Sequence, residues 1–546
     1  MTIIADTLWY ARMAAALARV VLRPVSYEET VAMVRRRMAA RDQRFLALAA
    51  LHIYGYPQSP YLQLLGHAGC EYGDLETLVR QRGLEPTLES LRRAGVYLSY
   101  EEFKGKVPVV RNGRTFHFSE QDFANPFLRA GVETRTGGTR SRGSPVSVGL
   151  QFVAESMSLN FHLALAALNL LGQPAVLWSP GVSLLGGSLA FAHIGNPPVR
   201  WFAMHDPNDP SLGPRSRRLP RLTALLARGR GIRLPPPEFT PVDTPEPVLA
   251  ELLSLRDRRG GCFIFTSPSA AVRLAALADR WGATLRGVTF LAGMEPLTPG
   301  KAADVQRAGA RVGSVYGFTE GGVAGIPCGG AQAPDDMHLA MQDFVLIPHR
   351  RPFGEIEELN AFMLTSLAAM PPKVMLNVEI DDFGEVTTRR CGCPLDALGL
   401  HQHLTSVRSF TKLTGEGSTI LGTDCVRILE EVLPREFGGR SIDYQLLEVE
   451  DEQRLTRLLL LVSPDVGPVD ERRVLERFIA EVRARTSQGM RMWRQAETIR
   501  VVRREPVATP RGKILPFHTQ ALAAFMVGGS ADLAALAAPH PAGRPT

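Results

Sequence analysis

Cysteine is scarce in this chain. Its 546 residues include six cysteines, which stand at Cys70, Cys262, Cys328, Cys391, Cys393 and Cys425. A disulfide-stapled secreted domain carries more cysteines for its size, at regular spacings. The sequence therefore excludes a disulfide scaffold and favours a reducing compartment.

Long uninterrupted apolar runs are also missing. The most hydrophobic stretch, Phe152–Trp178, contains a glutamate, two asparagines, a histidine and a glutamine. Such a composition favours a buried or amphipathic helix over a membrane span. The apolar stretch Leu8–Leu22 is broken by two arginines, and no small-residue cleavage pattern follows it, so we expect no secretory signal. Together these features predict a cytoplasmic protein without a membrane span.

No block of like charge dominates the chain. The formal net charge is +7, and lysine and arginine neither form a concentrated run nor alternate with aromatic residues. We therefore expect no nucleic-acid groove, while the mild basic bias suits an anionic substrate such as a nucleotide. The length exceeds what one hydrophobic core sustains, so at least two domains are expected. We find no internal repeat.

Several segments have clear secondary-structure signals. Residues 1–120 have helical spacing of apolar residues, apart from a hairpin signal at Asn112-Gly113. Beyond them, apolar strand-like runs alternate with helical stretches, at 174–178, 262–266, 287–293 and 311–316. This alternation predicts an α/β layer structure.

The character of the sequence changes after Arg408. Strand-like segments at 446–450, 455–463 and 497–503 surround a helical stretch at 470–486. We predict a large multi-layer α/β domain over 1–407, with 1–120 as its helical N-terminal part. A small mobile α+β domain over 408–527 and a flexible tail over 528–546 complete the expected organisation.

The segment Arg135–Pro145 reads Arg-Thr-Gly-Gly-Thr-Arg-Ser-Arg-Gly-Ser-Pro. Glycines allow backbone N–H groups to converge on one ligand, and hydroxyl and guanidinium groups add donors that suit phosphate. The segment does not match the Gly-x-x-x-x-Gly-Lys-Ser/Thr pattern of P-loop enzymes. The apolar stretch Val146–Leu171 that follows is long enough for a helix. The segment alone leaves two alternatives open, a phosphate cradle and a solvent-exposed basic turn.

Two further segments follow predicted strands. They are Gly293-Met294-Glu295 and Tyr316-Gly317-Phe318-Thr319-Glu320. Ligands of open α/β sheets bind beyond the carboxyl ends of the strands. A tyrosine can stack on a base, a threonine hydroxyl can bind a phosphate, and a glutamate can hold Mg²⁺. Each segment by itself is equally consistent with a turn that has a capping acid.

Taken in order, Thr136–Ser141 and Tyr316–Glu320 resemble the adenylate-forming superfamily of acyl-CoA synthetases, luciferases and related ligases. The resemblance is strongest to the phenylacetate–CoA ligase branch and its acyl-protein synthetase relatives, and extends from about Leu91 to Ile514. Asp382, in Asp-Phe-Gly, resembles the acid that holds the ribose hydroxyls. Arg408 stands where the family has its hinge arginine, and Lys513, in Pro-Arg-Gly-Lys-Ile, resembles the adenylation lysine.

The resemblance implies that ATP and a carboxylic acid form an acyl-adenylate, whose acyl group then passes to a thiol, most plainly coenzyme A. Lys513 would stabilise the transferring phosphoryl group, Glu320 would position Mg²⁺ and Arg408 would serve the hinge. The other implied ATP-binding residues are Thr136, Gly137, Gly138, Thr139, Arg140, Ser141 and Thr319 for the triphosphate, Gly293, Met294, Glu295, Tyr316 and Gly317 for adenine, and Asp382 for ribose.

The chain departs from the family pattern in two places. Arg140 and Arg142 stand where the family loop usually has a lysine, and the usual Arg-x-Asp-Asp hinge is absent around Arg408. Three alternatives therefore stay open for the second half-reaction and for activity itself. The acceptor can be a protein or carrier thiol or an amine, and the chain can be a nucleotide-binding regulatory protein without turnover.

A second group of residues has metal-binding chemistry: Cys328, His338, Cys391 and Cys393. Cys391-Gly392-Cys393 resembles the Cys-x-Cys element with which some phenylacetate–CoA ligase relatives bind a metal. Three thiolates and one imidazole imply a closed, structural zinc site. The alternatives are buried free thiols, or His401 or His403 in place of His338. The sequence leaves the acyl substrate and the oligomeric state open, a dimer included.

Overall fold

The structure is a computed structural model. It describes residues 3–21, 23–128, 131–135, 145–179, 185–209, 214–353, 356–409, 412–415, 418–421, 425, 427–439, 443–450, 454–483, 498–507 and 516–518. Thr136–Ser141 and Lys513, with the functions expected of them, lie outside these residues.

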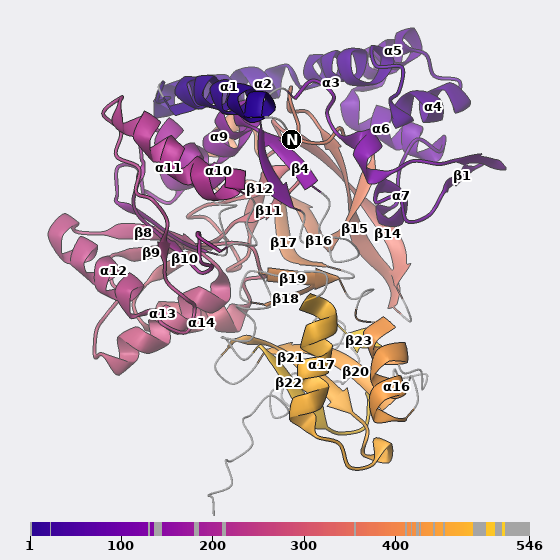
Figure 1. Cartoon of the computed structure of the whole chain (residues 1–546). Coiled ribbons are helices and arrows are strands. Elements are labelled where there is room, and N and C mark those ends of the chain that lie inside the picture. Colours follow the sequence, from indigo (N-terminus) through magenta and orange to yellow (C-terminus); the bar gives the residue numbers. More distant parts are fainter. Residues whose placement is uncertain are drawn as a thin grey trace, which may run out of the picture.

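The N-terminal part is helical, as the sequence predicts, and its helices lie side by side along one end of the molecule (Figure 1). They are α1 (Ile3–Val21), α2 (Tyr27–Ala39), α3 (Arg41–Ala49), α4 (Pro60–His67), α5 (Tyr72–Arg82), α6 (Leu84–Arg93) and α7 (Tyr100–Phe103). A capping box at Ser26 begins α2, with Glu29 as the reciprocal partner. The predicted hairpin is confirmed as β1 (Val109–Arg111) and β2 (Arg114–Phe116). Its turn residues Asn112 and Gly113 both have positive φ, at 46° and 78°.

A six-stranded parallel sheet has the order β10-β9-β8-β5-β6-β7. Its strands are β5 (Ala175–Ser179), β6 (Pro198–Ala203), β7 (Glu238–Phe239), β8 (Cys262–Thr266), β9 (Val288–Ala292) and β10 (Arg311–Ser314). Alternate residues of β5 enter two cores: Val176 and Trp178 pack with the helices α12 (Glu246–Arg259) and α13 (Pro268–Arg280). Leu177 packs on the opposite face, with α9 (Ser158–Ala167) and α10 (Leu185–His193). The remaining helices of this region are α11 (Pro214–Arg228) and α14 (Pro299–Arg307). The strand expectations at 174–178, 262–266 and 287–293 are confirmed.

A seven-stranded sheet, antiparallel throughout, has the order β11-β12-β13-β17-β16-β15-β14. Its strands are β11 (Tyr316–Phe318), β12 (Gly322–Pro327), β13 (Met337–Leu339), β14 (Phe344–Phe353), β15 (Ile356–Ser366), β16 (Val378–Thr388) and β17 (Gln402–Ser409). The N-terminal helices cover it: Phe45 and Leu88 share one core with Phe344 and Phe362. The sequence analysis did not assign strands β12–β17.

The stretch Val146–Leu171 does not begin as a helix. Pro145–Gly149 forms strand β4, which pairs antiparallel with β3 (Gly131–Arg135), and the helical segments α8 (Leu150–Phe152) and η3 (Val153–Met157) follow. The alternation of Val146, Ser147 and Val148 suits a strand, because successive side chains point to opposite faces. The expected helix is therefore confirmed only from Leu150 onward.

The C-terminal part is a small α+β unit, as expected. A short hairpin, β18 (Lys412–Gly415) and β19 (Ser418–Leu421), comes before it. Its four-stranded sheet has the order β22-β21-β20-β23, formed by β20 (Tyr444–Glu450), β21 (Thr456–Val462), β22 (Ile499–Arg503) and β23 (Phe517–His518). Two helices, α16 (Leu433–Phe437) and α17 (Glu471–Arg483), pack with this sheet in one core. The expected boundary at 407–408 remains a prediction.

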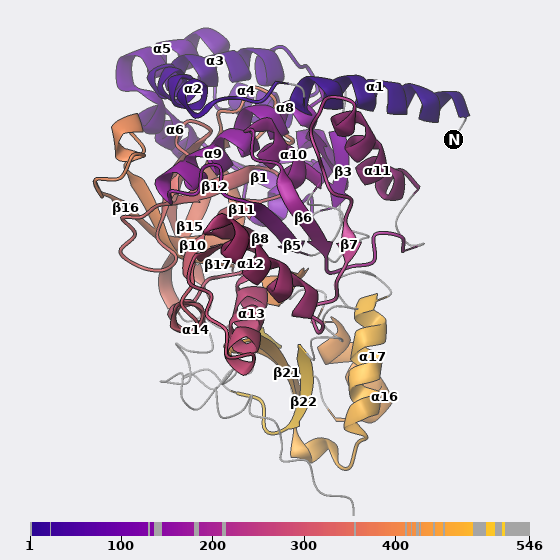
Figure 2. The same cartoon turned by 90° about the vertical axis from the view of Figure 1, so that its left-hand side faces the viewer.

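The small C-terminal unit contacts the large one beside α13 and α14 (Figures 1 and 2). Lys301 Nζ of α14 donates to Thr456 Oγ1 at 2.7 Å, and Thr298 Oγ1 donates to Glu450 Oε2 at 2.6 Å. Leu455 is buried in the core of the parallel sheet. Within the described ranges, the structure holds no helix that meets the length and hydropathy of a membrane span.

Candidate functional site

Two residues expected at one ligand are in direct contact. Tyr316 begins β11 and Asp382 lies in β16, and the Tyr316 hydroxyl donates to Asp382 Oδ2 at 2.7 Å. Burial, followed by the nearby Asp382 carboxylate, raises the pKa of Tyr316 well above its ordinary value. The phenol therefore keeps its proton and remains a hydrogen-bond donor. Asp381, the preceding residue, has a positive φ of 70°, which is uncommon for a residue with a side chain.

The end of β9 lies beside the start of β11. The Val315 backbone N–H donates to the Ala292 carbonyl at 2.8 Å, immediately before Gly293. A Cβ on Gly293 would lie 3.1 Å from the Val315 carbonyl oxygen, so the two segments approach closely there. The two segments that the sequence analysis assigns to adenine, at Gly293 and at Tyr316, are therefore neighbours.

The turn after β11 carries Thr319 and Glu320. Gly317 lies within β11 just before this turn; a Cβ there would lie 2.7 Å from the Gly322 carbonyl oxygen, so a side chain does not fit without a backbone shift. Glu320 Oε1 accepts from Lys104 Nζ at 2.7 Å and lies 3.8 Å from Lys373 Nζ. Thr319 is half-buried in the same turn.

Glu320 belongs to an ion cluster that the sequence analysis missed. Lys104 Nζ also donates to Glu120 Oε1 at 2.8 Å, and Lys373 Nζ donates to the same Glu120 oxygen. We call Lys104, Glu120, Lys373 and Glu320 the lysine–glutamate cluster. Burial opposes the charge on Lys104, but Glu320 and Glu120 outweigh burial and raise its pKa. Burial lowers the pKa of Lys373. No sequence motif marks the two lysines.

Glu295 is buried among polar groups. Its Oε2 lies 3.1 Å from Lys301 Nζ and accepts from Ser269 Oγ at 2.7 Å. The side chains of Lys301 and Glu295 are 1% and 0% exposed. Glu295 therefore anchors the contact between the two units, since Lys301 also binds Thr456. Met294, between Gly293 and Glu295, has a φ of 72°, which turns the chain after β9.

Arg408 lies near the end of β17, next to the Asp382 strand. Phe383 is its neighbour across the sheet, and Asp382 is paired with Ser409 in the same register. Arg408 Nη1 lies 3.6 Å from Asp335 Oδ2 and donates to the Val407 carbonyl at 2.7 Å. The arginine expected at the hinge thus borders the candidate ribose acid.

The predicted metal ligands come together. Cys328, His338, Cys391 and Cys393 place their ligand atoms within 4.8 Å of one another. The Cys328 and Cys391 sulfurs are 3.8 Å apart, and His338 Nε2 lies 3.4 Å and 3.3 Å from the Cys391 and Cys393 sulfurs. A tetrahedron with bonds of about 2.3 Å has edges of about 3.8 Å, so these spacings fit zinc.

The electrostatics of this cluster also suit a metal. His338 Nδ1 lies 2.6 Å from the Leu400 carbonyl, a contact that fixes Nδ1 as the donor and leaves Nε2 as the ligand atom. Hydrogen bonding from Cys328 lowers the pKa of Cys393 below its ordinary value, which favours a thiolate there.

The alternative histidines differ from each other. His403 Nε2 or Nδ1 lies within 4.8 Å of ligand atoms of His338, Cys391 and Asp396, and the His403 ring is 4.0 Å from the His338 ring. Its Nδ1 is 2.7 Å from Asp336 Oδ1. Among the described residues, His401 belongs to no such group. His403 therefore lies beside the metal-ligand cluster, and His338 remains the histidine that groups with the three cysteines.

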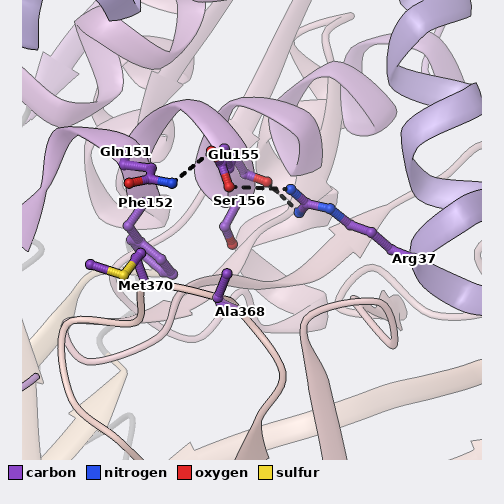
Figure 3. Close-up of a pocket in the computed structure, with 8 residues that line it drawn as sticks. Arg37, Gln151, Phe152, Glu155, Ser156, Ala368 and Met370 are labelled. Atoms are coloured by element: carbon purple, nitrogen blue, oxygen red, sulfur yellow. Dashed lines mark hydrogen bonds and ion pairs between the residues drawn. The ribbon is translucent and has the colours of Figure 1, made fainter. Parts of the chain in front are cut away.

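A small pocket lies between η3 and the 368–370 segment (Figure 3). Its empty volume is about 200 Å³, and Phe152 and Met370 form its apolar part. Arg37 faces it from α2 and lies 3.8 Å from Glu155 Oε2 and 3.3 Å from Asp343 Oδ1. The charges at this pocket are thus neutralised within the protein.

Comparison with known proteins adds a likeness of structure. No protein-family model matches the sequence, and no curated protein matches it. The structure is similar to 2-hydroxyisobutyryl-CoA ligase in complex with 2-HIB-AMP and CoA, with a TM-score of 0.51 and 16% identity over 89% of this chain and 91% of that one. The amide bond synthetase McbA from Marinactinospora thermotolerans gives a TM-score of 0.40 and 13% identity over 91% of this chain and 97% of that one. The first likeness establishes a shared fold.

Proposed function

We propose that this chain, whose fold is that of the adenylate-forming enzymes, is an AMP-forming ligase. It activates a carboxylic acid with ATP and passes the acyl group to a thiol, most plainly coenzyme A. The observation that carries the proposal is the meeting of Tyr316, Asp382 and the Gly293 strand end, which are far apart in the sequence. The resemblance in sequence assigns all three to one nucleotide.

The proposed roles follow the chemistry of each side chain. Asp382 accepts the ribose hydroxyls, Tyr316 and Met294 flank adenine, and Thr319 donates to phosphate. Glu320 fits a Mg²⁺ site, since this ion is commonly bound by one or two carboxylates together with substrate phosphates. When bound, the ion neutralises charge on the phosphates.

Two groups outside the described residues complete the proposal. Thr136–Ser141 would bind the triphosphate, and Lys513 would offset the charge that develops as the carboxylate attacks the α-phosphorus. Arg408, beside the Asp382 strand, would serve the movement of the small C-terminal unit, whose proposed bounds are 408–527.

The acceptor and the acid define the finer proposal. The similar structure of 2-hydroxyisobutyryl-CoA ligase contains CoA, whereas McbA is an amide bond synthetase, so thiol and amine acceptors are both represented among the neighbours. We favour coenzyme A within the phenylacetate–CoA ligase-like branch, because this branch has the Cys-x-Cys element that Cys391 and Cys393 resemble.

We also propose that Cys328, His338, Cys391 and Cys393 hold a structural zinc ion. The donor set and the spacing of the sulfur and nitrogen atoms support this. The ion would join the end of β12 and strand β13 to the segment that follows β16. With four protein ligands, it would leave no position for catalytic water.

Pyrophosphate exchange tests the proposed function. Purified protein is incubated with ATP, labelled pyrophosphate and a panel of aryl and fatty acids. We expect acid-dependent exchange that falls at least a hundredfold in Lys513→Ala, because the lysine offsets transition-state charge. Asp382→Asn should chiefly raise the KM for ATP. The exposed variant Arg200→Met, far from these residues in sequence, serves as the control. Exchange that survives Lys513→Ala unchanged would contradict the role of the lysine.

The replaced loop lysine and altered hinge favour a second candidate, a nucleotide-binding regulatory protein. Tight AMP binding without pyrophosphate release under any acid would support it. Mass spectrometry of products formed with CoA alone would separate a free-thiol acceptor from a carrier thiol or an amine.

A further inference from the structure

The lysine–glutamate cluster places two cations against the carboxylate that we assign to Mg²⁺. Lys104 comes from the end of α7 and Lys373 from the segment before β16. Their side chains are 13% and 2% exposed, and those of Glu120 and Glu320 are 11% and 12% exposed. Four ionisable groups with little access to water therefore share one site next to the Thr319 turn.

The connections in the cluster are unequal. Lys104 bridges both carboxylates, at 2.8 Å from Glu120 Oε1 and 2.7 Å from Glu320 Oε1. Lys373 is bonded to Glu120 and lies 3.8 Å from Glu320 Oε1. Among the described residues, Lys104 is thus the nearest cation to Glu320, while Glu120 competes with Glu320 for the same ammonium group.

Aromatic rings fix the position of the lysines. Lys373 Nζ lies 5.2 Å from the centre of the Phe103 ring, and Lys104 Nζ lies 5.6 Å from the same ring. Both ammonium groups are held by ring and carboxylate contacts at once. Lys104 is therefore a fixed counter-ion for Glu320 and not a mobile surface charge.

We propose that Lys104 is a positioning residue that competes with Mg²⁺ for the Glu320 carboxylate, and that Glu120 sets the strength of this competition. Without the metal, Lys104 neutralises Glu320 and holds it beside the nucleotide site. With metal-bound ATP, Glu320 would be available to hold the metal, and Lys104 would keep its bond to Glu120. This inference rests on the proposed function, because it takes Glu320 as the residue that meets the metal.

The proposal predicts shifts of opposite sign for two substitutions. Lys104→Met removes the competing cation, so Glu320 should favour metal-bound nucleotide more strongly. Glu120→Gln removes the carboxylate that shares Lys104, so the Lys104–Glu320 bond should strengthen and the preference should fall. Each shift should be about tenfold, the size expected for one charge-assisted hydrogen bond.

The measurement uses the dissociation constant of α,β-methylene-ATP under two conditions. The ratio is the constant measured with EDTA divided by the constant measured with excess Mg²⁺, so a larger ratio means a stronger preference for metal-bound nucleotide. Isothermal titration calorimetry gives both constants without turnover. We expect the ratio to rise about tenfold in Lys104→Met and to fall about tenfold in Glu120→Gln. Lys104→Arg keeps the charge and should stay within about threefold of the unsubstituted protein.

Arg80→Met is the matched control. It breaks an exposed ion pair on α5, in which Arg80 Nη2 lies 2.8 Å from Glu76 Oε1 and no lysine takes part. Its ratio should not change. If Lys104→Met does not fold, Lys104→Gln and Glu120→Gln still provide the test of sign. Equal ratios in all variants, or shifts of the same sign in both cluster variants, overturn the inference. If the unsubstituted protein binds the analogue neither with EDTA nor with Mg²⁺, the proposed function is wrong, and the inference that rests on it is wrong as well.

Discussion

Removal of the Lys301 ammonium group should strongly destabilise the large unit. Lys301 donates to Glu295 at 3.1 Å, to Ser269 at 3.2 Å and to Thr456 at 2.7 Å. In Lys301→Met, the buried Glu295 carboxylate loses its counter-ion but keeps its desolvation cost. Breaking one side of a buried ion pair costs about 3–5 kcal/mol. We expect a loss of this size in the free energy of unfolding.

The double variant Lys301→Met with Glu295→Gln gives the decisive comparison. It removes both charges, so we expect it to be more stable than Lys301→Met alone, by about 2 kcal/mol. Glu295 Oε1 has no hydrogen-bond partner within the described part of the chain, which makes the isolated carboxylate still more costly.

Urea unfolding followed by tryptophan fluorescence provides the assay. Trp178 and Trp201 are buried in the parallel sheet, so their emission reports on the large unit. Arg200→Met is the control, because the Arg200–Glu238 pair is exposed and should contribute less than about 1 kcal/mol. A Lys301→Met variant within about 0.5 kcal/mol of the unsubstituted protein, or a double variant less stable than the single one, would refute the reasoning.

Three further predictions concern the other sites. Purified protein should contain about one zinc per chain by elemental analysis, and Cys393→Ser should lose most of it and unfold at lower temperature; full retention of zinc would contradict the ligand set. Thr456→Val should loosen the small unit without unfolding it, so limited proteolysis between the units should speed up several-fold, and an unchanged cleavage rate would count against that contact. Burial lowers the pKa of His162 to about 4, below its ordinary value of 6.5. The folded state therefore disfavours the protonated imidazole, so the stability that the neutral His162 contributes is present above pH 6.5 and is lost as the pH falls toward 4. His162→Gln should flatten the pH dependence of urea unfolding in that window, and an unaltered slope would exclude His162 as its source.

The parallel sheet was predictable because of where it lies. Strands β5, β8 and β9 are buried at every position, so each reads in the sequence as an unbroken apolar run between turns. Strands β14 and β15 were not predicted, because polar residues such as Arg350, Arg351 and Asn360 interrupt their apolar pattern.

The candidate site was predictable only in part, for a similar reason. Tyr316 and Gly293 follow recognisable strands, and Asp382 belongs to a recognisable motif, so their types and order pointed to one ligand. Lys104 and Lys373 belong to no motif, and their partner Glu320 is 216 positions from Lys104 in the chain. Only the folded topology brings them together. The same holds for Lys301, whose partner Thr456 is 155 positions away.

The hydrogen bond between Tyr316 and Asp382 has a consequence for the proposed ribose contact. The phenol donates to Asp382 Oδ2 at 2.7 Å and so restricts the rotation of the carboxylate. A carboxylate has about four lone-pair positions on its two oxygens, so one bond from a phenol does not by itself exhaust the acid as an acceptor. If Asp382 binds ribose as we propose, the hydroxyls would meet an acid whose orientation is already set.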